Sequence, residues 1–319
     1  MELQTQIPFA QSDNPIDYQS KVVLFGSCFV ENIGTKLAYF KFQQQQNPFG
    51  ILFQPLAIAN LMQRAIARKK YQQDEVFEQD GVWRCFDVHS DLRSSSSEEL
   101  LHLLNQRLEE TRISLETSSH IIITLGTAWV YERQASGKVV ANCLKVPQKQ
   151  FTKKLLSVAE IEASLQNIVS LIQNVNPKAQ IIFTISPVRH LKDGFVENQR
   201  SKAHLITALY TILSSRAQSR EIAYFPAYEI MMDELRDYRF YGTDMVHPNP
   251  LAVDYIWEKF KLVWISESAY SVMDEVESVQ KGLLHRPFNP DSEAHQKFKT
   301  SLRTKITYLQ ERYPFMKFD

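Results

Sequence analysis

The feature that most constrains the fold is a set of short, almost fully apolar segments separated by helix-like segments. The apolar segments are Val22–Phe25, Ile121–Leu125, Ile181–Ile185 and, less cleanly, Ile222–Phe225. A strand that is apolar on both faces must be covered on both faces, and strands that alternate with helices are typical of a parallel sheet. The sequence therefore predicts a central sheet of four or five parallel strands with helices on both sides.

Apolar residues at helical spacing predict the helices of this core. The expected ranges are Phe29–Tyr39, Leu56–Lys69, Ser97–Glu116, Val158–Asn174, Asn198–Ser215 and Leu251–Phe260. Two antiparallel hairpins are also expected, one turning at Asp80-Gly81 and one at Ser136-Gly137.

The pattern changes after about Val263. No further strand is expected, and two charged helices are separated by a turn at Pro287–Pro290. We therefore divide the chain into a core domain, residues 1–263, and an α-helical C-terminal extension packed on the core, residues 264–319.

Charge and cysteine content narrow the function classes. Lys plus Arg and Asp plus Glu number 36 each, so no overall basic field indicates nucleic acid or membrane as a partner. Cys28, Cys85 and Cys143 are odd in number and widely spaced, which favours free thiols in a reducing compartment. Together with an N-terminus that lacks a signal pattern, this predicts a cytoplasmic protein. The sequence does not indicate an oligomeric state.

The segment Gly26-Ser27-Cys28 lies between the first predicted strand and the first predicted helix. Ligand sites in parallel α/β sheets form where the carboxyl ends of strands meet the N-termini of helices. The free N–H groups of a helix N-terminus can also stabilise a developing oxyanion. At this place Ser27 is either a nucleophile or only a helix cap.

A second candidate lies near the end of the core, where Asp244 stands three residues before His247. Asn249-Pro250 is typical of a helix start and fixes His247 two residues ahead of the cap. A carboxylate at this spacing on a turn can orient the imidazole. The alternatives are a capping or core role for His247, or metal ligation. The other histidines show no clustered ligand spacing, so we expect no metal and no cofactor.

These segments resemble the GSCFA-domain family, within the SGNH (GDSL-type) hydrolase superfamily. The segment GSCFV (26–30) nearly reproduces the motif for which the family is named. The other similar segments are NPFGILFQP (47–55), LGTAWVY (125–131), VANCLKVP (140–147), SPVRHLKDG (186–194) and RDYRFYGTDMVHPN (236–249). The resemblance implies a flavodoxin-like three-layer α/β/α core with a central parallel sheet. It also implies that Ser27 is the nucleophile, His247 the base and Asp244 the residue that orients His247.

The resemblance further implies an oxyanion hole made by the Ser27 N–H group, a glycine and an asparagine. Gly50 fits the glycine by position. The GxND-like motif that should supply the asparagine is replaced by Gly126-Thr127-Ala128-Trp129. We assign Asn142 to this role, with Asn47 as an alternative.

Cys28 is expected to turn with the first helix and to pack as a small apolar residue. Phe29, Ile33 and Leu37 mark the buried face of that helix. The sequence therefore favours Ser27 over Cys28 as the attacking residue.

Substrate contacts are expected from Asn47, Thr127, Trp129, Arg189 and His190. Arginine can bind a carboxylate or phosphate in a fork, and aromatic rings can stack on sugars. Asn198, Ser201 and Lys202, which follow in the next helix, either contact a polar substrate or serve the structure.

Three function classes remain. The first is a serine esterase that removes small acyl groups, such as acetyl, from a carbohydrate or other polar substrate through an acyl-Ser27 intermediate. The second is an acyltransferase that uses the same three residues. The third is a non-catalytic carbohydrate-binding protein on an SGNH scaffold, because fold does not determine function.

Overall fold

The computed structural model describes residues 4–215 and 221–318 and contains a central sheet of five parallel strands. The strands are β1 (Lys21–Gly26), β2 (Gln43–Gln46), β5 (His120–Leu125), β9 (Gln180–Ile185) and β10 (Ile222–Phe225), in the order β10-β9-β5-β1-β2. The prediction of a parallel sheet is confirmed. The sequence did not indicate β2, because this edge strand is four half-buried glutamines without an apolar run.

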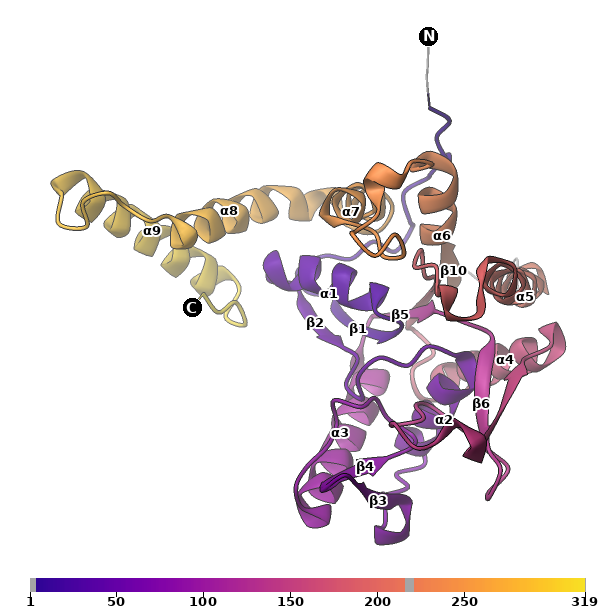
Figure 1. The fold of residues 1–319 in the computed structure, drawn as a ribbon. Helices are drawn as coiled ribbons and strands as arrows, with labels where there is room; N and C mark the ends of the chain where they lie inside the picture. The colour runs from indigo at the N-terminus through magenta and orange to yellow at the C-terminus, as the bar shows by residue number, and fades with distance from the viewer. Residues whose placement is uncertain (1–3, 216–220, 319) are drawn as a thin grey trace.

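Helices cover both faces of the sheet, which gives the predicted three layers (Figure 1). One face carries α1 (Phe29–Tyr39) and α7 (Pro250–Trp264). The other carries α2 (Pro55–Ile66), α3 (Ser97–Thr117), α4 (Val158–Val175) and α5 (Phe195–Ser215).

Each face of the sheet has its own hydrophobic core, because alternate side chains of a strand point to opposite sides. Val22 and Leu24 of β1 pack in the cluster that contains α1 and α7. Val23 and Phe25 pack in the cluster that contains α2 to α5.

Both predicted hairpins are present outside the central sheet. β3 (Val76–Gln79) pairs with β4 (Val82–Cys85), and β6 (Trp129–Arg133) pairs with both β7 (Lys138–Val140) and β8 (Phe151–Leu155). The remaining short elements are η1 (Gln73–Glu75), η2 (Gln148–Gln150), η3 (Leu191–Asp193), α6 (Ala227–Glu229), η4 (Ile230–Glu234) and η5 (Tyr238–Phe240).

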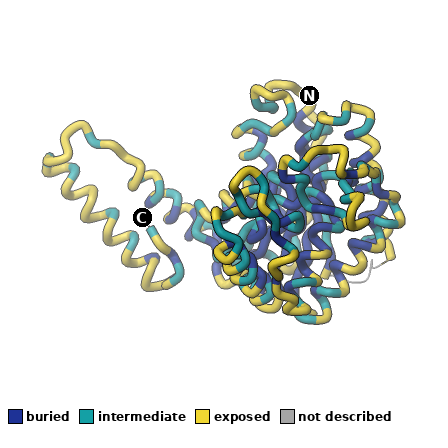
Figure 2. Tube along the Cα trace, turned by 60° about the horizontal axis from the view of Figure 1, so that its bottom comes forward, coloured by how far each residue is buried: buried dark blue, intermediate teal, exposed yellow. Residues whose placement is uncertain are grey.

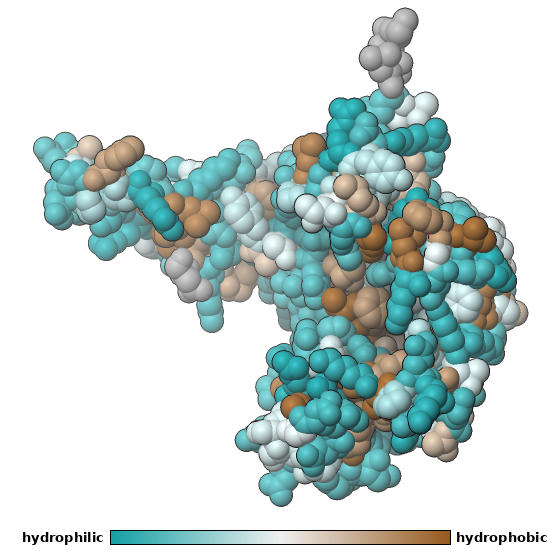
Figure 3. Space-filling model, in the orientation of Figure 1, coloured by the Kyte–Doolittle hydropathy of each residue, from teal (hydrophilic) through white to brown (hydrophobic). Residues whose placement is uncertain are grey.

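The C-terminal region forms an arm of two helices, α8 (Glu267–Leu284) and α9 (Glu293–Arg312), that projects from α7 (Figures 1 and 2). The start of α8 belongs to the core on the α1 face through Ala269, Val272 and Met273. The chain then returns to the body, where the ring of Tyr313 lies 5.1 Å from that of Tyr18. The visible surface of the arm is largely hydrophilic, with few hydrophobic residues (Figure 3). None of the helices within the described ranges is both long and apolar enough to cross a membrane.

Candidate active site

Asp244 and His247 form a hydrogen-bonded pair in the loop before α7. Asp244 Oδ2 lies 2.6 Å from His247 Nδ1, while Asp244 Oδ1 accepts the backbone N–H groups of Val246 and His247 at 2.9 and 3.0 Å. The helix start behind the loop is as expected, since Asn249 Oδ1 accepts from Ala252 N at 3.0 Å. These backbone hydrogen bonds, with that of the His247 ring, lower the pKa of Asp244 to about 2. Asp244 can therefore orient the imidazole of His247 for proton transfer.

The loop of His247 is attached to the segment that follows β9. Arg189 N donates to Val246 O at 3.3 Å. The next residue, His190, places its ring edge-on to Phe53 at 5.7 Å. Burial lowers the pKa of His190 to about 4, with smaller contributions from the charges of Lys202 and His247. His190 is therefore neutral at physiological pH, and a charge on His247 would disfavour its protonation further.

Ser27 lies at the end of β1 and is fully buried. Its N–H group donates to Thr124 O at 3.0 Å, which continues the pairing of β1 with β5 by one residue. Its Oγ has no hydrogen-bond partner among the described residues, so no bond joins it to His247. Ser27 thus remains a predicted nucleophile without the expected contact in this structure.

Cys28, not Ser27, is the residue of this turn that reaches the surface. We expected Cys28 to be buried, but it is half-buried and immediately precedes α1 in helical conformation. The reason is the strand pairing: the hydrogen bond of the Ser27 N–H group holds Ser27 inside the sheet layer. The chain therefore turns into the helix only at Cys28. Burial raises the pKa of the Cys28 thiol, and the charge of Glu31 adds to this, whereas Lys202 and the N–H groups of Cys28 and Phe29 lower it.

Lys202 on α5 is fully buried behind this turn. Its Nζ donates to Gly126 O and to Ser186 O, each at 2.8 Å, and so joins the ends of β5 and β9. Burial lowers the pKa of Lys202 to about 7. Ser201 is also buried; its Oγ accepts from Ala128 N at 2.7 Å and shares a hydrogen bond with Thr127 Oγ1 at 3.0 Å. Lys202 and Ser201 therefore serve the structure rather than contact a substrate.

The two backbone N–H groups that we expected in the oxyanion hole are already bonded. Ser27 N donates to Thr124 O, and Gly50 N donates to Asn47 O at 2.8 Å. Gly50 has a φ of +70°, and a Cβ there would lie 2.4 Å from His89 Cβ, so glycine is needed for the turn itself. Asn47 holds the end of β1, since its Oδ1 accepts from Gly26 N at 2.9 Å, and its Nδ2 is buried without a partner.

A cavity of about 480 Å³ brings together four of the predicted site residues, which are Thr127, Trp129, Asn142 and His190. Trp129 forms part of its wall, with Nε1 donating to Glu197 O at 3.3 Å. Asn142 Oδ1 accepts from Leu144 N at 2.9 Å, so its oxygen stabilises the loop. Phe53 and His190 also line this cavity, whereas Ser27, Asp244 and His247 do not.

Arg189 does not line that cavity. It contributes to a separate one of about 520 Å³ together with Phe195, Tyr238, Tyr241 and Met245. The Arg189 guanidinium lies over the Phe195 ring at 5.3 Å, and its Nε is buried without a partner. The predicted substrate contacts are thus divided between two cavities.

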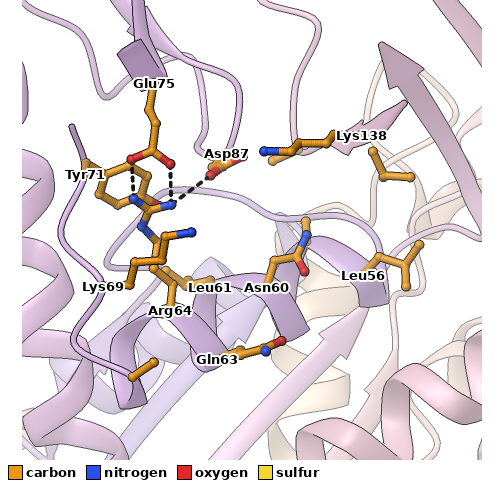
Figure 4. A pocket seen from close by; sticks show the side chains of 14 residues that line it. Leu56, Asn60, Leu61, Gln63, Arg64, Lys69, Tyr71, Glu75, Asp87 and Lys138 are labelled. Atoms are coloured by element: carbon orange, nitrogen blue, oxygen red, sulfur yellow. Dashed lines mark hydrogen bonds and ion pairs between the residues drawn. The ribbon is translucent and has the colours of Figure 1, made fainter. Parts of the chain in front are cut away.

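A third cavity is lined by α2, by β7 and by the segments between α2 and β3 and after β4 (Figure 4). Its most buried charge, Arg64, forms a fork with Glu75 and stacks on Tyr71 at 3.7 Å. Both Nη atoms of this guanidinium donate to Glu75, while its Nε is buried without a partner. In the ranges 4–215 and 221–318, no cluster of three or more His, Cys, Asp or Glu side chains could hold a metal ion.

Comparison with known proteins agrees with the sequence resemblance. The model of the GSCFA family matches residues 21–260, and that of the GSCFA domain protein, C-terminal domain, matches residues 276–319. A search of proteins of curated function gives no significant match.

Three solved structures are distantly similar. An acetyl xylan esterase (Est2A) from the rumen bacterium Butyrivibrio proteoclasticus is 12% identical with a TM-score of 0.42, over 78% of this chain and 65% of that one. An active-site mutant of a family two carbohydrate esterase from Clostridium thermocellum, in complex with celluohexase, is 10% identical with a TM-score of 0.39, over 77% and 64%. An acetyl esterase mutant with acetate ion is 9% identical with a TM-score of 0.38, over 82% and 99%. The chain therefore spans slightly less than two thirds of the first two structures.

Proposed function

The chain belongs to the GSCFA family, and from this premise we propose that it is an ester hydrolase that removes small acyl groups, such as acetyl, from a carbohydrate or other polar alcohol. The observation that carries the proposal is the Asp244–His247 pair, with 2.6 Å between carboxylate and imidazole. The pair belongs to a loop attached to the segment after β9, at the carboxyl edge of a parallel sheet, where ligand sites of such sheets lie.

The proposed reaction is acyl transfer in two steps. His247 accepts a proton from a nucleophile in the turn Gly26–Cys28, for which the sequence predicts Ser27. The acyl group moves to the protein and the alcohol leaves with the proton from His247. Water, activated by the same imidazole, then releases the acid. Asp244 keeps the Nδ1 side of the ring occupied, so that Nε2 is the atom that exchanges protons.

The cavity lined by Thr127, Trp129, Asn142 and His190 supports a polar, ring-shaped alcohol as the substrate. Trp129 and Tyr131 contribute aromatic surfaces, and Asn142 and Thr127 contribute polar groups. Aromatic faces with polar groups around them are suited to sugar rings. We place the alcohol part of the ester here.

The test is hydrolysis of an aryl acetate and of acetylated xylo-oligosaccharides by the wild type and by His247→Ala. We expect His247→Ala to lower kcat/KM by about 10³-fold or more, because the proton acceptor is lost. His204→Ala is a suitable control, since His204 lies on α5 and its Nδ1 bonds to Leu156 O, just after β8. Transfer of the acetyl group to a sugar hydroxyl instead of to water would favour an acyltransferase. Binding of the oligosaccharide without turnover in the wild type would contradict the proposal and favour a binding protein.

A further inference from the structure

We infer that the cavity of Arg189 binds a carboxylate, and that the ester substrate is therefore an acidic carbohydrate rather than a neutral one. This inference rests on the proposed function and names the class of its substrate. The cavity has a volume of about 520 Å³ and shares no lining residue with the cavity of Trp129. No step of the proposed reaction uses it.

The first observation concerns the Arg189 guanidinium. Arg189 is half-buried, and its Nε is buried without a hydrogen-bond partner. Among the described residues no hydrogen bond or ion pair uses this guanidinium, which lies over the Phe195 ring at 5.3 Å. A buried charged group without a partner is unfavourable, and arginine can form two parallel hydrogen bonds with one carboxylate. A carboxylate in the cavity would therefore meet a donor that this part of the protein leaves unused.

The other charged residues that line the cavity are already paired. Arg236 Nη2 lies 3.0 Å from Asp233 Oδ1, and Asp237 Oδ2 lies 2.8 Å from Arg239 Nη2. Asp237 Oδ1 also accepts from Arg239 N at 2.9 Å. Of the described side chains that line the cavity, Arg189 thus carries the one charge that no partner balances. The cavity offers a single positive charge to a ligand.

The walls favour a carboxylate on a sugar ring over a phosphate. They are mainly apolar or aromatic, and Phe195, Tyr238 and Met245 are each at least half exposed. The rings of Tyr238 and Tyr241 lie 5.9 Å apart. A carboxylate carries one negative charge and matches one guanidinium, whereas a phosphate carries about −1.5 to −2 and would need further donors. Aromatic faces beside the cation are suited to the ring of a sugar acid.

The cavity and His247 share one loop. Met245 lines the cavity, and His247 follows it by two residues. Consecutive Cα atoms are about 3.8 Å apart, so these two residues are at most about 7.6 Å apart at Cα. Arg189 N donates to the O atom of Val246, the residue between them, at 3.3 Å. A carboxylate bound to Arg189 is therefore held beside the residue that exchanges protons in the proposed reaction.

The segment after β9 contributes to both cavities. Arg189 and Leu191 line the cavity of the inferred carboxylate, whereas His190 and Lys192 line the cavity of Trp129. A substrate that spans both has its ester-bearing unit in the cavity of Trp129 and its acidic unit at Arg189. The acid then belongs to a unit next to the esterified one, as in an acetylated oligosaccharide that contains a uronic acid.

The test uses three acetylated xylo-oligosaccharides that differ in one side unit, which is glucuronic acid, glucose or glucose 6-phosphate. We expect wild-type kcat/KM to be about tenfold or more higher with glucuronic acid than with glucose, because one charge-assisted contact is gained. The difference should lie mainly in KM, since the contact is the same in the bound substrate and in the transition state. Equal values for the acidic and the neutral substrate would overturn the inference. A preference for the phosphate would overturn the assignment of a carboxylate.

Variants show whether Arg189 makes the distinction. Arg189→Met should bring the ratio of kcat/KM for the acidic and the neutral substrate close to one. Arg189→Lys should keep part of it, because lysine retains the charge but not the fork. Arg107→Met is the matched control, since Arg107 lies on α3, pairs with Glu110 at 2.9 Å and lines neither cavity. A wild-type ratio in Arg189→Met would overturn the inference.

Binding distinguishes this inference from the proposed function. If no ester tested is hydrolysed, the proposed function fails, and calorimetry with the non-acetylated oligosaccharides still tests the cavity. We expect the wild type to bind the oligosaccharide with glucuronic acid about tenfold or more tightly than the one with glucose, and Arg189→Met to lose this difference. Equal affinities, or no binding of either oligosaccharide, would overturn the inference.

Discussion

Asp244 binds His247 twice, through the imidazole Nδ1 at 2.6 Å and through the backbone N–H group at 3.0 Å. The two contacts use different carboxylate oxygens, so the aspartate fixes both the loop and the ring plane. An aspartate with a pKa of about 2 is charged at every pH above about 3. Loss of activity on mild acidification therefore cannot arise from protonation of Asp244.

We expect Asp244→Asn to lower kcat/KM for an aryl acetate by about 10²- to 10⁴-fold, because an amide cannot hold the same imidazole tautomer. KM should change little, since Asp244 does not line the cavity. The measurement is steady-state kinetics beside Asp233→Asn, whose aspartate pairs only with Arg236 among the salt bridges of the described chain. Equal kinetics in the two variants would show that the pair has no part in catalysis.

Lys202 should make stability depend on pH. Its pKa is about 7 in the folded protein, below the usual value of 10.5, so the unfolded chain binds more protons between these two values. Stability therefore rises with pH in this window, by about 2 kcal/mol between pH 7 and pH 9 for this group alone. Below pH 7 Lys202 is protonated in the folded protein as well as in the unfolded chain. The free energy of unfolding is then reduced by the full cost of burying the charge.

Urea unfolding at pH 7 and pH 9 tests this. Lys202→Met should lose the pH-dependent gain, whereas Lys178→Met, which changes an exposed lysine, should keep it. If both variants show the wild-type increase in the free energy of unfolding from pH 7 to pH 9, the increase does not come from Lys202. Burial would then lower the pKa of Lys202 far less than stated here.

Much of the fold follows from the sequence, because most strands carry continuous apolar runs, α1 has a regular apolar stripe, and Asn249-Pro250 marks the start of α7. Strand β2 could not be predicted, because its four glutamines have no apolar run and only its backbone pairing with β1 makes it a strand. The burial of Ser27 could not be predicted, because it depends on a hydrogen bond from Ser27 N to Thr124 O, two residues far apart in sequence. The structural role of Lys202 could not be predicted from the sequence either. Its partners are the backbone oxygens of Gly126 and Ser186, and no residue type indicates such a contact.

Gly126 should not tolerate a side chain. An added Cβ would lie 3.0 Å from Phe53 O and 3.1 Å from Ser27 Cβ, so these neighbours would have to move by a few tenths of an ångström. We expect Gly126→Ala to lower the free energy of unfolding by about 1 to 3 kcal/mol, as overpacking does. Gly242→Ala is the matched control, since its nearest contact would be an ordinary 3.6 Å from His247 O. Urea unfolding of both variants gives the comparison, and equal stabilities would contradict the tight packing at Ser27.

Trp129 should determine affinity for the alcohol part of the substrate. Its ring lines the cavity of about 480 Å³, and Lys153 Nζ lies 4.7 Å above the ring. Loss of the stacking surface in Trp129→Ala should raise KM for an acetylated oligosaccharide by about tenfold, at about 1.4 kcal/mol per tenfold change. kcat should remain close to wild type, and the kinetics of a small aryl acetate should change little, because it does not fill the cavity. Tyr238→Ala is the informative control, because Tyr238 lines the cavity of Arg189 instead. An increase in KM for Tyr238→Ala but not for Trp129→Ala would place the sugar in that other cavity.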